Sequence, residues 1–210
     1  LATGLTRSLV VGVAAAMLAG VLLALVFAWF AIFLRANLFI VGLATNSFAA
    51  AVTTYASWLI AGREGQLRYP NALTLPKIEI PIIRDIGFLS FLSAHTPLDY
   101  LAWLLIPTVS YLIFRTKFGL RLRAVGEDAN AARAVGLRVN QIKYLAIAAS
   151  GLLAGLAGAH LALTLGGFVQ DMSGGRGWVG LVAAIVGNAT AWGSVAAAVL
   201  FGAAQGVANS

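Results

Sequence analysis

The sequence predicts an all-α protein, a polytopic bundle of membrane-spanning helices, and three observations support that class. The chain of 210 residues is 60% hydrophobic, and only 10% of its residues are charged. A soluble domain carries about 25% charged residues, so a soluble fold of this size could not cover its surface with so few. The uncharged residues also form long runs, and a helix needs about 20 apolar residues to cross a bilayer. Membrane lipid is therefore an expected partner.

The charged and metal-binding residue types argue against two other classes. Fourteen basic residues against seven acidic ones give a formal net charge of +7, which in a soluble protein would suggest nucleic-acid binding. Here the basic residues lie between hydrophobic runs, where they set membrane topology, so we expect no nucleic-acid partner. The sequence holds no cysteine and two histidines, so no metal site is expected.

The first two spans follow one another closely. They cover about Leu9 to Leu34 and Ala36 to Ala61, with Arg35 between them. Residues 62–98 then mix polar and apolar residues, and residues 62–96 contain three prolines. Within that loop, polar and apolar residues alternate at Lys77–Ile80. We expect an extended segment there, and not a central strand, because of the neighbouring prolines. We also expect a short interfacial helix at Ile86–Leu92.

Two further spans complete the predicted set of long helices. The third covers about Asp99 to Phe114 and contains Pro107, which a spanning helix tolerates where neighbours satisfy the freed carbonyl. The fourth covers about Tyr144 to Leu165. In the fourth, small residues recur at helical spacing and predict a ridge for close helix packing. The ridge consists of Gly151, Ala154, Gly155, Gly158, Ala159 and Ala162.

The end of the chain predicts a broken helix. After a glycine-rich loop, Gly166–Gly177, the apolar segments Trp178–Gly187 and Gly193–Val207 are each short for a bilayer about 30 Å thick. We therefore expect a re-entrant or broken helix followed by a tilted span. One continuous helix is the alternative.

The distribution of basic residues predicts the orientation. Residues 115–143 carry seven basic and two acidic side chains, whereas residues 62–98 carry four basic and three acidic ones. Cytoplasmic loops are rich in lysine and arginine, so residues 115–143 should be cytoplasmic and residues 62–98 external.

The basic loop holds a candidate docking helix. Residues Gly126 to Gly136 predict one short helix, in which Glu127 or Asp128 caps the first turn and Gly136 suits the left-handed position after the last. Ala129, Ala132, Arg133 and Gly136 would share one face. Such a face suits docking into a partner's groove, and an ordinary interfacial loop helix is equally compatible.

A family resemblance rests on the segments that follow. TKFGLRLRAVGEDANAARAVGLRVNQIKYLAIAASGLLAGLAGAHLAL, from Thr116 to Leu163, resembles the inner-membrane permease of bacterial ABC importers, in the branch of ribose-type, branched-chain amino-acid and nucleoside permeases. Asp171–Gly187 and Ala196–Gly206 resemble the nucleoside and simple-sugar subgroup, and the resemblance covers most of Arg35–Gly206. The segment NATAW, Asn188–Trp192, departs from that subgroup, which usually has a basic or aromatic residue and a proline there.

The resemblance implies a transport subunit rather than an enzyme. It would be the permease of an ATP-driven importer that translocates nucleosides or related simple sugars. ATP-Mg would be bound by a separate ATPase subunit, and this chain would hold no cofactor, which agrees with the lack of a G-x-x-x-x-G-K-[ST] motif. A second permease subunit and a periplasmic or lipoprotein solute-binding protein are the other implied partners. Family members are longer, so residues 1–210 are expected to be one truncated transmembrane domain.

The expected site residues fall into three groups. The resemblance implies ATPase coupling through Gly126, Glu127, Asp128, Ala131, Ala132, Arg133 and Gly136. Polar side chains inside spans are costly, so Asn46 and His160 are candidates for the translocation pathway, although an interhelical bond or an interfacial position would also explain them. In the glycine-rich loop, Asp171 and Arg176 would pair or contact the binding protein.

Three other functions remain open. The chain could be an ABC permease for another small solute, such as branched-chain amino acids. An ion-coupled transporter would need a charged relay within the spans, for which His160 is the available candidate. A membrane scaffold without transport would need neither a docking helix nor a broken helix.

Overall fold

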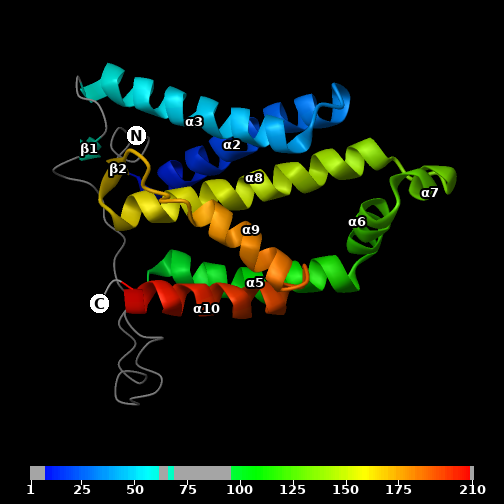
Figure 1. Cartoon of the computed structure of the whole chain (residues 1–210). Helices are drawn as coiled ribbons and strands as arrows, with labels where there is room; N and C mark the ends of the chain where they lie inside the picture. Colours follow the sequence, from blue (N-terminus) through cyan, green and yellow to red (C-terminus); the bar gives the residue numbers. More distant parts are fainter. Residues whose placement is uncertain (1–7, 62–65, 69–95, 209–210) are drawn as a thin grey trace, which may run out of the picture. The chain divides into compact units, whose positions relative to one another are not determined.

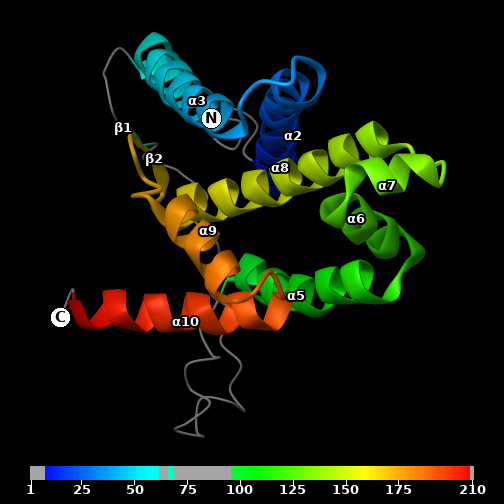
Figure 2. The same ribbon diagram turned by 45° about the vertical axis from the view of Figure 1, so that its right-hand side comes forward.

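The computed structural model describes residues 8–61, 66–68 and 96–208. Apart from one short strand pair, the regular structure in these residues is helical, which confirms the all-α class (Figures 1 and 2). The chain forms two compact units, Leu1–Leu75 with Ala124–Met172, and Pro76–Arg123 with Ser173–Ser210. The predicted extended segment and short helix between residues 77 and 92 lie outside the described residues.

In the first unit, the first two predicted spans are confirmed. Helix α2, Leu9–Ala28, continues into one turn of π-helix, η1, at Trp29–Phe33. Arg35 then adopts a left-handed φ of 50°, and the chain turns into helix α3, Leu38–Ala61. The Asn37 side chain starts α3 by accepting a hydrogen bond of 2.9 Å from the backbone N–H two residues later.

The core of the first unit is the crossing of α2 with helix α8, Val139–Thr164, seen side by side in both views (Figures 1 and 2). Glycines allow the two backbones to touch. A Cβ placed on Gly151 would lie 2.6 Å from the carbonyl oxygen of Gly20, and one on Gly155 would lie 2.8 Å from Met17 Cα. Such close approach of two backbones increases the van der Waals contact between the helices. This contact is important in a membrane, because the hydrophobic effect does not drive helices together in lipid.

The predicted small-residue ridge is therefore confirmed in part. Gly151 and Gly155 face α2, and Ala159 is buried. Ala154, in contrast, is exposed, and no described residue lies within 4 Å of a Cβ built on Gly158. The side of α8 that faces α2 therefore contains every fourth residue of the ridge. Ala154 and Gly158 lie outside this contact.

A short strand pair joins two distant segments of the first unit. Strand β1, Gln66–Arg68, pairs antiparallel with β2, Gly167–Val169, with Leu67 opposite Phe168. Strand β1 contacts α3, and β2 follows α8 directly. The ladder thus connects the C-terminal ends of two membrane helices, where the sequence predicts only a loop.

In the second unit, the third predicted span is helix α5, Pro97–Arg115, with Pro107 inside it. Its first turn is closed by a capping box, in which the Asp99 carboxylate accepts from both the backbone N–H and the hydroxyl of Thr96 at 2.8 Å. Helix α6, Lys117–Glu127, follows after one residue.

The second unit also contains the predicted helix break. Helix α9, Arg176–Val186, and helix α10, Ala191–Ala208, are separate, so the broken-helix prediction is confirmed and the continuous helix is wrong. Asn188 and Ala189 adopt left-handed φ values of 52° and 53°, which turn the chain without a proline. The Thr190 hydroxyl then accepts a 3.1 Å hydrogen bond within the first turn of α10.

Candidate functional site

The structure places a very short helix at the centre of the basic loop. Helix α7 covers Ala129–Ala134, and Asp128 is its N-cap. The Asp128 carboxylate accepts hydrogen bonds from the backbone N–H groups of Asn130 (2.7 Å) and Ala131 (3.1 Å). These bonds, the one from Ala131 foremost, hold the pKa of Asp128 below its ordinary value of 3.8.

The predicted helix Gly126–Gly136 is too long. Gly126 and Glu127 form the end of α6, so of the two predicted caps Asp128 is the one used. The extended backbone of Asp128 separates α6 from α7. In a continuous helix, the first N–H groups of α7 would donate hydrogen bonds to carbonyls of the preceding turn. Here the Asp128 carboxylate accepts the hydrogen bonds of two of these N–H groups instead.

The predicted end of the helix is confirmed. Gly136 has a φ of 81°, which a side chain would disfavour. Its N–H donates to Arg133 O at 2.9 Å, and the Leu137 N–H donates to Ala132 O at 3.0 Å. This pair of bonds is a Schellman motif, which satisfies the last carbonyls of α7 and directs the chain into α8.

The exposed face of α7 differs from the predicted one. Ala132 is only 4% exposed and its helix contacts α8, so the structure turns Ala132 away from the exposed face. Apart from Asn130, which is also exposed, the exposed residues of α7 are Ala131, Arg133 and Ala134, and they are followed by Val135, which is 76% exposed. We call these four residues the α7 surface. Helical spacing alone did not reveal which alanine faces inward, because a six-residue helix gives too little periodicity.

A basic hollow lies where α7 meets α8. It has a volume of about 260 Å³ and is lined by Arg133, Leu137, Arg138, Val139, Asn140 and Gln141. Arg133 also donates to the Asn130 side chain at 3.1 Å, which fixes its direction. The two arginines in this lining, Arg133 and Arg138, suit contact with an acidic partner surface.

Changing the cap tests the local account of α7. Asp128→Ala is expected to speed hydrogen exchange at the Asn130 and Ala131 amides, whereas Asp128→Asn should preserve protection because asparagine caps as well. Because the folded pKa is lowered, the carboxylate contributes fully above pH 3.8 and loses its contribution as the pH falls through the folded value. The Asp128→Asn variant should lack that acid dependence. Equal exchange in the alanine and asparagine variants would contradict the capping role.

The other predicted site residues are dispersed. Asn46 is exposed on α3, His160 is half-buried on α8, and both helices contact α2. Asp171 is exposed with a left-handed φ of 56°, and Arg176 begins α9. None of these four residues lines the basic hollow. Among the described residues, no group of three or more histidines, aspartates and glutamates could hold a metal ion.

These features define a class of protein. In the described residues four helices are long and apolar enough to cross a membrane, Leu9–Phe33, Leu38–Leu59, Pro97–Arg115 and Val139–Thr164. A short capped helix follows the third and precedes the fourth. The class is a multi-pass helical membrane protein with a short capped helix on one loop.

The chain belongs to the family described as branched-chain amino acid transport system / permease component, which it matches over residues 1–209. Together with the four candidate spans, this indicates a multi-pass protein of the inner membrane.

Its relatives include several named permeases. The chain is 33% identical over 201 residues to the guanosine ABC transporter permease protein NupQ of Bacillus subtilis, covering 91% of this chain and 60% of the relative. It is 32% identical to the putative glucose ABC transporter permease protein TsgC13 of Haloferax volcanii, covering 84% and 54%. It is 30% identical to the nucleoside ABC transporter permease protein NupC of Lactococcus lactis, covering 80% and 53%. The chain thus spans little more than half the length of these relatives. No solved structure matches it significantly.

Proposed function

We propose that the chain is part of the membrane-spanning subunit of an ATP-driven importer for nucleosides or related simple sugars. Membership of the permease family is the observation that carries this proposal. The names of the relatives narrow the solute, because two of the three are nucleoside or guanosine permeases and the third is a putative glucose permease.

ATP hydrolysis would take place in a separate ATPase subunit that binds ATP-Mg, so this chain would need no cofactor of its own. The α7 surface is the part of the chain best suited to receive that subunit. It is short, capped at both ends and therefore rigid, and its alanines allow a partner to approach closely. Arg133 and Arg138 at the basic hollow favour an acidic groove on the ATPase.

The solute would pass between this subunit and a second permease subunit after delivery by an external binding protein. Asn46 and His160 remain candidates for the pathway, since both are polar side chains on candidate spans. Asp171, exposed in the turn after β2, and Arg176, at the start of α9, are candidates for contact with the binding protein.

A permease for branched-chain amino acids is the second candidate, and the description of the family favours it. Uptake by the full-length importer in proteoliposomes, with its ATPase, second permease and binding protein, separates the two. The proposal predicts ATP-dependent uptake of inosine or ribose and none of leucine. ATP-dependent leucine uptake alone would support the second candidate, and uptake of inosine driven by an ion gradient without ATP would contradict both.

A further inference from the structure

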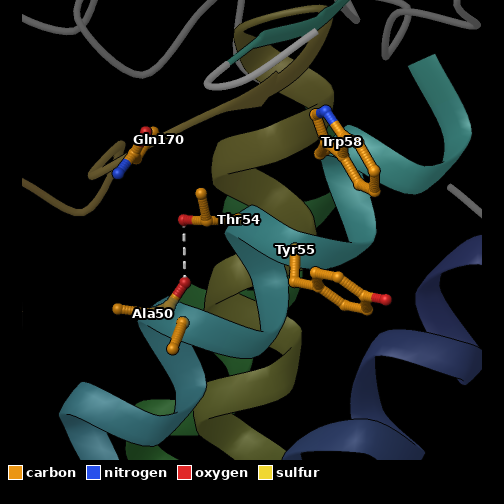
Figure 3. Close-up of a pocket in the computed structure, with 6 residues that line it drawn as sticks. Ala50, Thr54, Tyr55, Trp58 and Gln170 are labelled. Atoms are coloured by element: carbon orange, nitrogen blue, oxygen red, sulfur yellow. Dashed lines mark hydrogen bonds between the residues drawn. The ribbon is translucent and has the colours of Figure 1, made fainter. Parts of the chain in front are cut away.

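A second hollow lies in the first unit, far along the chain from α7. It has a volume of about 410 Å³, within the range of about 300–1,000 Å³ typical of small-molecule sites. Five of its six lining residues come from the C-terminal half of α3, and the sixth is Gln170 (Figure 3). Neither the family match nor the relatives assign a role to these residues.

An aromatic pair lines part of this hollow. Tyr55 and Trp58 stand one helical turn apart on α3, with ring centroids 6.1 Å apart and planes inclined at 28°. Both remain open, since Tyr55 is 62% and Trp58 is 50% exposed. Open aromatic faces at this spacing offer a stacking surface for a flat ring.

Polar atoms lie at the edge of the same hollow. The Thr54 hydroxyl donates to Ala50 O at 2.9 Å, so its oxygen remains available to accept a hydrogen bond (Figure 3). Gln170 is exposed and supplies an amide that both donates and accepts. These two groups could bond the hydroxyl or ring-edge atoms of a bound solute.

The strand pair explains why Gln170 is near α3. It directly follows β2, whose pairing with β1 ties the segment to a strand that contacts α3. The turn after β2 is closed by a hydrogen bond of 3.1 Å from Met172 N to Val169 O. The ladder therefore holds Gln170 in place instead of leaving it on a free loop.

The charge of the hollow selects among solutes. The six described residues that line it, Ala50, Ala51, Thr54, Tyr55, Trp58 and Gln170, carry no charge. A zwitterionic amino acid would bring an ammonium and a carboxylate that find no opposite charge among these six residues. A neutral solute with a flat ring and hydrogen-bonding edges has no such cost.

We propose that this hollow is a binding subsite for a neutral nucleoside, in which Tyr55 and Trp58 stack on the base and Thr54 and Gln170 bond its polar edges. The inference rests on the proposed function and deepens it by naming the solute class. In the proposed orientation, the hollow lies at the outer end of α3, where a solute released by a binding protein would arrive.

The test compares three tryptophan variants of the full-length importer in proteoliposomes. Trp58→Leu should raise the KM for inosine about tenfold, equivalent to about 1.4 kcal/mol, by removing the stacking surface. Trp58→Phe should restore most of the affinity because it keeps an aromatic face. Trp29→Leu is the matched control, because Trp29 is 48% exposed and stacked on Phe33 yet lies outside the hollow.

The outcomes separate the subsite from the function. If Trp58→Leu and Trp29→Leu have the same KM for inosine, the pair is an interfacial anchor and the subsite is refuted while the importer stands. If the wild type transports ribose but not inosine, the nucleoside assignment fails alone. If it transports neither with ATP, the proposed function fails. If the importer with Trp58→Leu does not assemble, the Gln170→Leu variant tests the subsite instead. The proposal predicts that this variant has a raised KM for inosine, and an unchanged KM would refute the subsite.

Discussion

Replacement of Gly155 by leucine is expected to prevent the folded protein from accumulating. In the structure, a Cβ at this position would collide with the carbonyl oxygen of Ala16 and lie 2.8 Å from Met17 Cα. Both are backbone atoms of α2, so no side-chain rotation relieves the clash, and the helices must separate. Overpacking typically costs about 1–3 kcal/mol, and a backbone obstacle places this variant at the upper end or beyond.

The same helix supplies the control for that experiment. No described residue lies within 4 Å of a Cβ at Gly158, so Gly158→Leu should be tolerated. The measurement is the monodisperse fraction and the thermal midpoint of each detergent-solubilised variant. Equal behaviour of the two leucine variants would show that α2 does not pack on α8 through Gly155.

Replacement of Ala131 by tryptophan is expected to abolish ATP-dependent uptake and release the ATPase subunit without unfolding the permease. Ala131 is exposed in the first turn of α7, so a bulky side chain there fills the space that a docking groove needs. Loss of close contact at the centre of an interface commonly weakens binding by more than tenfold, or more than about 1.4 kcal/mol.

Two comparisons make the Ala131 result specific. Ser173→Trp places the same bulk at an exposed position in the glycine-rich loop and should retain the ATPase. Ala132→Trp should instead lower the thermal midpoint, because the Ala132 side chain is buried. Retention of the ATPase by Ala131→Trp at the wild-type level would remove the α7 surface from the coupling interface.

The features that the sequence predicted correctly have local causes. Charge-free runs are sufficient to locate spans, because the bilayer penalises charge along the whole helix. Gly136 was predictable as the left-handed residue after α7, and the structure gives it a φ of 81°. The broken C-terminal helix was predictable from the length of its two parts, although the turn itself uses Asn188 and Ala189 in left-handed conformations that are uncommon for such residues.

The features that the sequence did not predict depend on distant parts of the chain. The inward direction of Ala132 is set by the packing of its unit, and a helix as short as α7 has too little periodicity to reveal it. Strands β1 and β2 have three residues each, and helices α5 to α8 lie between them in the sequence. Neither strand therefore has a local sequence signature. The hollow at Trp58 could not be predicted for the same reason, since Gln170 reaches α3 through that ladder.

The central claim is that the α7 surface lies inside the cell, where an ATPase can bind it. Residues 1–210 contain no cysteine, so thiols introduced in them one at a time can report its location in a protein otherwise free of cysteine. Val135→Cys, at a position 76% exposed in the native chain, and Ser173→Cys would be treated with a membrane-impermeant maleimide in intact cells. The account predicts that Ser173→Cys is labelled, that Val135→Cys is labelled only in inverted vesicles, and that added ATPase subunit protects it there. Labelling of Val135→Cys from outside intact cells would contradict the account.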